Sequence, residues 1–202
     1  MLIIDRIVWF INSGISIIIV AVIALMIVRL IADALDLNPF GWTSRTVRRL
    51  SDGFVMPVRG GLRGFGIETK FAPLVVILVV ILLGYFFLQL VGTIASTVDG
   101  VITSVQRGSL FLVLGFILYG LLSIYILLIV IRIVFSWGTI SYTNRLMRFL
   151  VDVTEPLLGP LRRMIPPLGW MDISPLVAIL ILWLFQAAVQ GTLLRGAAFR
   201  GF

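Results

Sequence analysis

Four charged side chains in the second half of the chain are the best candidates for chemistry. Glu155, Arg162, Arg163 and Asp172 all fall within residues 155–172. An arginine guanidinium forms paired hydrogen bonds with a carboxylate or a phosphate, so Arg162 and Arg163 could recognise a partner's carboxylate or a lipid headgroup. In the simpler interpretation, Glu155 and Asp172 pair with these arginines and fix the fold of the segment, because buried or interfacial charges are usually paired within the chain. We favour this structural interpretation.

Few groups in the segment could catalyse a reaction. The chain contains no histidine and no cysteine, which excludes imidazole catalysis, a thiolate metal site and a catalytic cysteine. General acid or base catalysis would depend on Asp172 or Glu155, with no nucleophile or metal ligand nearby. We therefore expect a protein that is not an enzyme and that holds neither a metal nor a cofactor.

Prolines and a glycine shape the backbone around these charges. The Pro-Pro-Leu-Gly sequence at residues 166–169 indicates a rigid turn rather than a ligand cradle, with glycine permitting a positive φ. The prolines between residues 156 and 167 predict that no long helix passes through this region. Ser174 and Pro175 suit the N-cap and the first position of a new helix.

Four long apolar stretches must position this segment. The chain has 202 residues, of which 60% are hydrophobic and only 12% are charged, whereas average soluble proteins are about one quarter charged. Residues 7–28, 72–93, 110–131 and 176–194 contain no Asp, Glu, Lys or Arg. As a helix, a stretch of about 20 such residues matches a hydrocarbon core of about 30 Å. The sequence thus predicts an all-α membrane protein with four transmembrane helices.

The basic residues concentrate in the two long connecting segments. The first holds seven and the second five of the 16 basic residues: Arg29, Arg45, Arg48, Arg49, Arg59, Arg63 and Lys70, then Arg132, Arg145, Arg148, Arg162 and Arg163. The positive-inside rule therefore predicts that both segments face the cytoplasm and that both termini lie outside. The net charge of +7 is then explained by this orientation and by anionic headgroups, and we expect no nucleic-acid partner.

The chain repeats itself at an offset of 103 positions. Arg29 aligns with Arg132 and Asp52 with Glu155, and the prolines and glycines of the two connecting segments align as well. These matches involve residue types that do not replace one another freely, so coincidence is a poor explanation. We predict two parallel helix-loop-helix units, residues 1–100 and 101–202, related by a pseudo-two-fold axis along the membrane normal. One residue must be dropped near residue 70 to keep the alignment.

Each connecting segment also carries a helical pattern. In the second segment, Leu146, Phe149, Leu150, Val153 and Leu157 recur at helical spacing, and Thr143 or Asn144 can cap the start. Residues 47–54 repeat the pattern in the first segment. We expect two amphipathic helices in the headgroup plane, with arginines reaching toward phosphates.

The second connecting segment resembles a known family. Residues 155–175 read Glu-Pro-Leu-Leu-Gly-Pro-Leu-Arg-Arg-Met-Ile-Pro-Pro-Leu-Gly-Trp-Met-Asp-Ile-Ser-Pro, which is similar to the motif of the YggT/YlmG family of bacterial and plastid membrane proteins. The family usually has Gly-Gly at positions 169 and 170. The first unit is degenerate, with Gly60 aligned with Arg163. The motif implies these contact residues for a partner or lipid: Arg132, Trp137, Glu155, Pro160, Arg162, Arg163, Pro166, Gly169, Asp172, Ser174 and Pro175.

The resemblance implies a multi-pass protein of the bacterial cytoplasmic membrane and two classes of function. Members are connected with cell division and envelope organisation, with osmotic stress and ion homeostasis, and with cytochrome assembly in plastids. We favour a non-enzymatic scaffold whose basic loops contact a membrane-protein partner and anionic lipid. The alternative is a channel or transporter, which would require a homo-oligomer because four helices enclose no obvious pore.

Polar residues within the spans bear on the same choice. Gln186 and Gln190 lie one turn apart in the fourth span, and Gln89 lies near the equivalent end of the second. They could line a polar path, but such residues more often form hydrogen bonds between helices, and we favour that interpretation.

Overall fold

A computed structural model describes residues 2–34, 41–64, 68–137, 144–165 and 172–195, and its regular structure in these ranges is entirely helical. The elements are, in order, α1 (Leu2–Ala34), α2 (Trp42–Gly64), the short 3₁₀ helix η1 (Thr69–Phe71), α3 (Ala72–Gln106), α4 (Leu110–Trp137), α5 (Arg145–Met164) and α6 (Ser174–Thr192).

Four of these helices are long and apolar enough to cross a bilayer, which confirms the four predicted spans. The candidate segments are Ile4–Asp33, Thr69–Gln106, Leu110–Ser136 and Ser174–Thr192. The 35 residues of α3 make a helix of about 50 Å, well beyond a hydrocarbon core of about 30 Å. The helix therefore extends past the predicted span at residues 72–93 and includes Asp99 near its end. The predicted unit boundary at residues 100 and 101 lies inside α3, and the division into two units stays a prediction.

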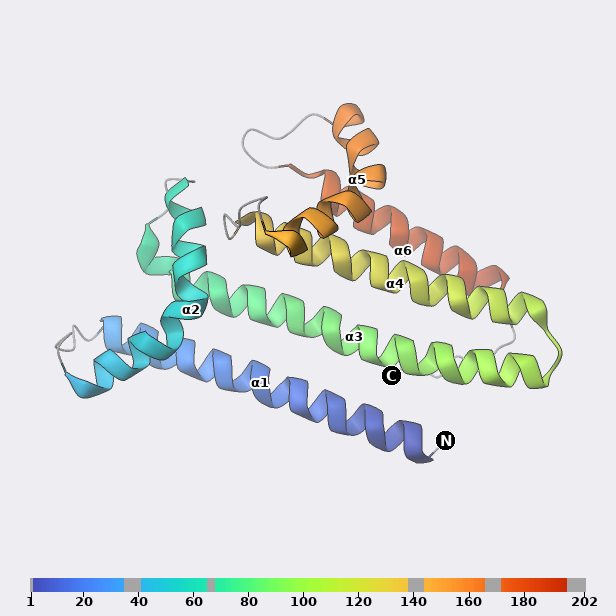
Figure 1. The fold of residues 1–202 in the computed structure, drawn as a ribbon, viewed down its shortest axis with the longest axis horizontal. Helices are drawn as coiled ribbons and strands as arrows, with labels where there is room; N and C mark the ends of the chain where they lie inside the picture. The colour runs from blue at the N-terminus through green and yellow to red at the C-terminus, as the bar shows by residue number, and fades with distance from the viewer. Residues whose placement is uncertain (1, 35–40, 65–67, 138–143, 166–171, 196–202) are drawn as a thin grey trace.

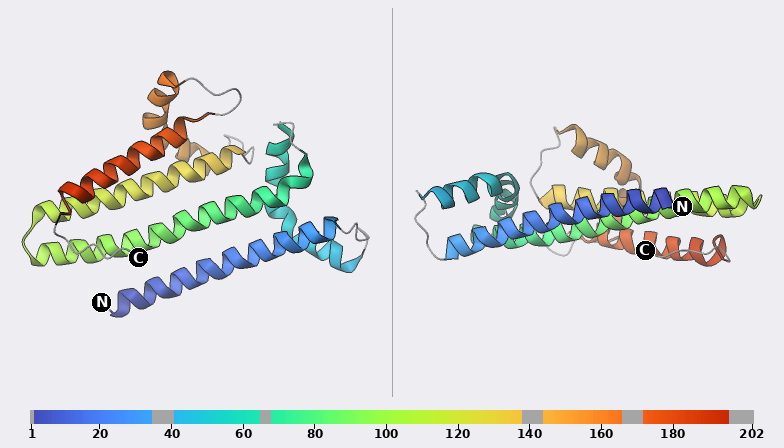
Figure 2. Two further views of the ribbon diagram at one scale, coloured as in Figure 1. Left: turned by 180° about the vertical axis from the view of Figure 1, so that it is seen from behind. Right: turned by 90° about the horizontal axis from the view of Figure 1, so that it is seen from below.

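The four long helices lie side by side in an open row, in the order α1, α3, α4 and α6 (Figures 1 and 2). Among the described residues, α1 packs against no long helix except α3, and α6 against none except α4. Glycines permit close packing within the row: a Cβ at Gly120 of α4 would lie 3.0 Å from Thr97 Oγ1 of α3. The row is not closed into a bundle, so both of its faces expose apolar side chains.

The two connecting helices, α2 and α5, lie at the same end of the row (Figure 1). Helix α2 packs on α1 and α3, and α5 packs on α4 and α6. The expected cap at Asn144 is present, because its side chain accepts a hydrogen bond from the backbone N–H of Leu146 at 2.9 Å. The buried face of α5 consists of Met147, Leu150, Thr154 and Leu158, whereas Phe149, one of the predicted apolar residues, is exposed.

The prediction that no long helix passes through the prolines of the second segment is wrong at Pro156 and Pro160, whereas Pro166 and Pro167 lie outside the described residues. Helix α5 continues through Pro156 and Pro160 to Met164, and α2 likewise contains Pro57. A proline removes one N–H donor and displaces the carbonyl four residues earlier, so it kinks a helix as readily as it ends one. Both helices bend along their length (Figure 1). The two α5 prolines are exposed, so the carbonyls that lose a donor lie on the side away from the buried face.

The buried positions of the two halves correspond to each other. Met26 and Val55 are fully buried in one cluster, and Ile129 and Leu158, the residues 103 positions later, are fully buried in another. Thus the apolar contacts between each connecting helix and its preceding span occupy positions that the sequence repeat aligns.

Candidate functional site

Arg132 is a buried arginine that joins α4 to α5. Its Nη1 donates to Thr154 Oγ1 at 2.6 Å, and its Nη2 pairs with Glu155 Oε2 at 2.7 Å. The Thr154 hydroxyl in turn donates to the carbonyl oxygen of Leu150 one turn earlier, at 2.6 Å. A buried charge is tolerated when it is paired and its hydrogen bonds are satisfied, and consecutive residues of α5 provide both partners.

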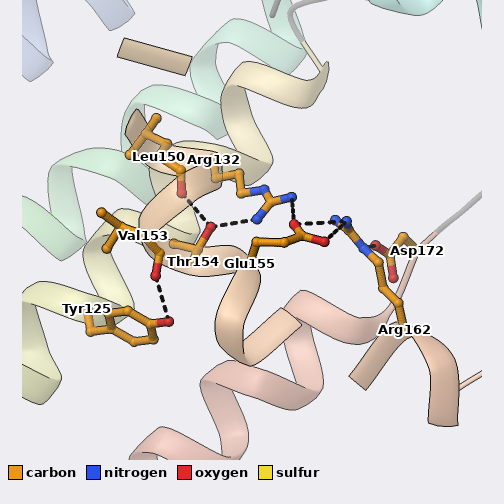
Figure 3. Close-up of polar contacts among 8 residues, drawn as sticks. All are labelled: Tyr125, Arg132, Leu150, Val153, Thr154, Glu155, Arg162 and Asp172. Atoms are coloured by element: carbon orange, nitrogen blue, oxygen red, sulfur yellow. Dashed lines mark hydrogen bonds and ion pairs between the residues drawn. The ribbon is translucent and has the colours of Figure 1, made fainter. Parts of the chain in front are cut away.

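The ion pairs continue from Glu155 to the start of α6. Arg162 Nη1 lies 3.4 Å from Glu155 Oε2, and Arg162 Nε lies 2.7 Å from Asp172 Oδ2. The other oxygen of Asp172 accepts the backbone N–H of Ser174 at 2.9 Å. Figure 3 shows this continuous series, which we call the α5 network. It consists of Arg132, Thr154, Glu155, Arg162 and Asp172.

The surroundings of Asp172 lower the pKa of its carboxyl group. Burial raises the pKa of this carboxyl group, but hydrogen bonding from Ser174 and the adjacent Arg162 guanidinium outweigh burial and bring the pKa below its ordinary value. The carboxylate is therefore ionised at neutral pH, as its contacts with a backbone N–H and a guanidinium require.

Ser174 is not the N-cap of the last helix, which corrects the sequence expectation. The side chain that accepts a hydrogen bond from the first turn is that of Asp172. Helix α6 begins at Ser174 itself, the preceding residue Ile173 is its N-cap, and Pro175 occupies the first turn. The Asp172 carboxylate accepts one of the N–H groups that the helix leaves without a partner. Ser174 is buried against the rest of the fold.

The first half of the chain contains an equivalent buried arginine. Arg29 is 2% exposed, and its Nη1 donates to the Ser51 hydroxyl and pairs with Asp52 Oδ1, the latter at 2.8 Å. The sequence separations of these contacts, 22 and 23, equal those of Arg132 with Thr154 and Glu155. Asp33 provides a second carboxylate, with its Oδ2 at 3.8 Å from Arg29 Nε.

The two halves of the chain differ farther along the connecting helices. Arg59 aligns with Arg162, yet its Nε is buried without a hydrogen-bond partner. Arg162, in contrast, pairs with two carboxylates. Among the described residues, the extended network is therefore seen in the second half of the chain.

The structure brings together part of the predicted site. The α5 network contains Arg132, Glu155, Arg162 and Asp172, and it contacts Ser174. The favoured interpretation, in which carboxylates pair with the arginines, thus holds for Arg162. Arg163 lies apart from these contacts, in an open concavity of about 520 Å³ lined by Asp152, Glu155, Pro156, Gly159, Pro160 and Arg163.

Other predicted site residues lie elsewhere or outside the description. Trp137 is the last residue of α4, but its side chain, like Pro166 and Gly169, lies outside the described residues. Thr154 was absent from the predicted site, although it is the buried partner of Arg132. The alignment of Ser51 with Thr154 in the repeat is the signal that could have identified it.

Gln186 takes part in contacts between helices, as favoured from the sequence. Its Nε2 donates to Ser123 Oγ of α4 at 2.6 Å and reaches the carbonyl oxygen of Tyr119 at 3.4 Å. Gln89 Nε2 instead bonds to the hydroxyl of Tyr85 within α3, at 3.2 Å. The Gln186 contacts tie α4 to α6 at Ser123, near the middle of α4 and away from the α5 network.

The fold and the site define a multi-pass α-helical membrane protein whose connecting helix is held to its spans by a buried arginine. The family model described as CCB3/YggT matches residues 111–193, the part of the chain that includes α4, α5 and α6. The chain belongs to the YggT/YlmG family.

Relatives come from both bacteria and plastids. The protein YggT of Escherichia coli strain K12 is 36% identical over 76 residues, which cover 38% of this chain and 40% of that protein. The YlmG homolog protein 2 of Arabidopsis thaliana, a chloroplastic protein, is 35% identical over 73 residues, covering 36% of this chain and 29% of its own length. The protein ycf19 of Porphyra purpurea is 32% identical over 91 residues, covering 45% of this chain and 95% of its own length. No solved structure matches.

Proposed function

We propose that this chain is a non-enzymatic scaffold protein of the bacterial cytoplasmic membrane, which presents α5 to a membrane-protein partner and to anionic lipid. It would serve cell division, envelope organisation or the assembly of a membrane complex. The chain matches only 40% of the length of the Escherichia coli relative. The function of the whole protein is therefore part of the proposal.

The α5 network is the observation that carries the proposal. It pairs Arg132, Glu155 and Asp172 in contacts within the chain, which suits a structural rather than a catalytic role. The same contacts fix α5 against α4 and α6 and leave the other side of α5 open. Arg163 and Phe149 are exposed there, the latter by 52%. Arginine and aromatic side chains are enriched at protein interfaces.

We propose that α2 and α5 face the cytoplasm and that both chain termini lie outside. Both connecting helices lie at one end of the row of spans, and most basic residues belong to their segments. Loops rich in arginine and lysine remain on the cytoplasmic side during membrane insertion. In that position α2 and α5 would contact anionic headgroups of the inner leaflet.

A channel in osmotic stress or ion homeostasis has weaker support. Among the described residues, α1 and α6 occupy opposite ends of an open row, so one chain provides no ring of helices around a pore. Gln186, a candidate for a polar path, is occupied by hydrogen bonds to α4. Conduction would require several copies of the chain.

Photocrosslinking in living cells tests the scaffold proposal. A photoreactive amino acid replaces Arg163 in α5 or, as the matched control, Gly60, the aligned and likewise exposed position of α2. We expect one defined protein adduct from position 163 and little from position 60. Arg162→Ala should remove the adduct because it breaks the α5 network, whereas Arg59→Ala should not. Equal adducts from both positions would contradict the proposal.

Flux measurements decide between the scaffold and the channel. Purified protein is reconstituted in proteoliposomes, and ion and osmolyte release is followed before and after an osmotic downshift. We expect no release above protein-free vesicles. Release that the Arg162→Ala/Arg163→Ala double variant loses would favour a channel instead.

A further inference from the structure

A cleft of about 680 Å³ opens between α3, α4, α5 and α6, beside the α5 network. Its walls are mostly apolar and include Phe86 of α3, Ile129 of α4, and Leu176, Leu180 and Trp183 of α6. Leu176 and Leu180 are 58% and 55% exposed. Because these residues belong to membrane-spanning helices, the molecules that meet the cleft from outside are those of the bilayer.

The cleft is polar at one end only. Arg132, Ser136, Arg162 and Asp172 line that end, where α4 finishes and α6 begins. Trp183 lies nine residues into α6, which corresponds to a depth of about 13 Å along the helix. The cleft thus combines a charged rim with an apolar depth, which matches the phosphate and the acyl chain of a phospholipid.

The first unit indicates where the phosphate would bind. Ser136 aligns with Asp33, whose carboxylate pairs with Arg29 at 3.8 Å and with Arg48 Nη2 at 3.1 Å. In the second unit, a serine stands one helical turn after Arg132, so this position supplies no carboxylate. A guanidinium donates paired hydrogen bonds to a phosphate in the same geometry as to a carboxylate. An external phosphate can therefore occupy the place that the Asp33 carboxylate fills in the first unit.

We propose that the cleft binds one phospholipid of the surrounding bilayer, with an acyl chain along α6 and the phosphate at Arg132, Ser136 and Arg162. The inference deepens the lipid part of the proposed function and rests on the membrane location given there. It does not depend on a protein partner at the outer side of α5.

A first pair of variants tests the apolar part of the cleft. Leu180→Trp fills the cleft with a larger side chain, whereas Leu184→Trp, one turn farther along α6, makes the same change at an exposed residue that does not line it. Protein is purified in mild detergent with phosphatidylglycerol, and retained lipid is counted by native mass spectrometry. We expect one tightly retained phospholipid per chain in the wild type and in Leu184→Trp, and at least a tenfold lower lipid-bound fraction in Leu180→Trp.

A second pair tests the polar end. Ser136→Asp restores the carboxylate of the first unit and should expel the phosphate, whereas Ser136→Asn is a neutral control of similar size. We expect at least a tenfold lower lipid-bound fraction for Ser136→Asp than for Ser136→Asn. Because Ser136 is exposed, both variants should fold, and this pair decides the matter if Leu180→Trp does not.

The outcomes separate this inference from the proposed function. A wild type that loses its lipid as readily as Leu180→Trp would overturn the inference, as would equal retention by Ser136→Asp and Ser136→Asn. The photocrosslink from position 163 is measured on the same variants. Its absence from the wild type would count against the scaffold proposal and would leave the lipid result unchanged.

Discussion

The guanidinium of Arg132 crosses from α4 to the hydroxyl of Thr154 on α5, with 2.6 Å between Nη1 and Oγ1, and both residues are buried. Arg29 and Ser51 form the same contact in the first half of the chain. In each half, therefore, a membrane-spanning helix holds its connecting helix through a buried arginine and a hydroxyl. The contact holds one face of α5 against α4 and so leaves the opposite face exposed. The proposed function depends on that exposed face.

Replacement of Thr154 by valine should destabilise the protein. Valine keeps the shape of the side chain but leaves a buried guanidinium N–H without its acceptor, which costs about 1–3 kcal/mol. Thr154→Ser is the matched control, because Ser51 performs this role in the first unit, and it should cost less than about 1 kcal/mol for the lost methyl group. Thermal unfolding in detergent, followed by circular dichroism, measures both. Equal losses from the two variants would show that the hydroxyl is unimportant.

Neutralising the acidic partner should affect the second unit more than the first. Among the described residues, Glu155→Gln leaves Arg132 with no full counter-charge in direct contact, whereas after Asp52→Asn the aligned Arg29 still has Asp33. We expect a loss of about 1–2 kcal/mol for Glu155→Gln, below the range for fully buried pairs because Glu155 is 44% exposed. Asp52→Asn should cost less. The same unfolding measurement compares them, and the reverse order would contradict this assignment of counter-charges.

Asp172 should make stability depend on pH in the acid range. Its pKa is lowered in the folded state, so the unfolded chain binds a proton more readily than the folded one does. The stabilisation is complete above the unfolded pKa of about 4 and is lost as the pH falls through the lower folded pKa. Melting temperatures of the wild type and Asp172→Asn should therefore differ at pH 7 and converge below about pH 4. A difference that persists undiminished at lower pH would exclude this cause.

The spans were predictable because the thickness of the hydrocarbon core sets the length of the apolar stretch that a spanning helix needs. The course of α5 was not, since the rule that proline ends a helix is local. The packing of Leu150, Thr154 and Leu158 on the neighbouring spans keeps the chain helical through Pro156 and Pro160. The pairing of Arg162 with Asp172 was predictable from opposite charges within one segment. The hydroxyl partner of Arg132 was harder to find, because only the alignment of Ser51 with Thr154 in the repeat points to Thr154.

Close packing at a glycine should be detectable by adding one methyl group. A Cβ at Gly100 of α3 would lie 2.4 Å from the ring of Phe116 on α4, whereas a Cβ at Gly14 of α1 would meet nothing within 4 Å. Gly100→Ala should therefore cost about 1–3 kcal/mol through overpacking. Gly14→Ala should be neutral or slightly stabilising, since alanine favours a helix more than glycine does. Similar melting temperatures for the two variants would argue against this contact between α3 and α4.

The proposed orientation can be measured directly because the chain contains no cysteine. Arg163→Cys places a single thiol on α5, and Arg107→Cys places one in the turn between α3 and α4, at the other end of the row; both positions are exposed. With α5 in the cytoplasm, a membrane-impermeant maleimide added to intact spheroplasts should label position 107 and spare position 163. Inside-out vesicles should give the opposite pattern. Labelling of position 163 from outside would reverse the topology and remove the basic connecting helices from the cytoplasmic leaflet, and with them the proposed contact to its anionic headgroups.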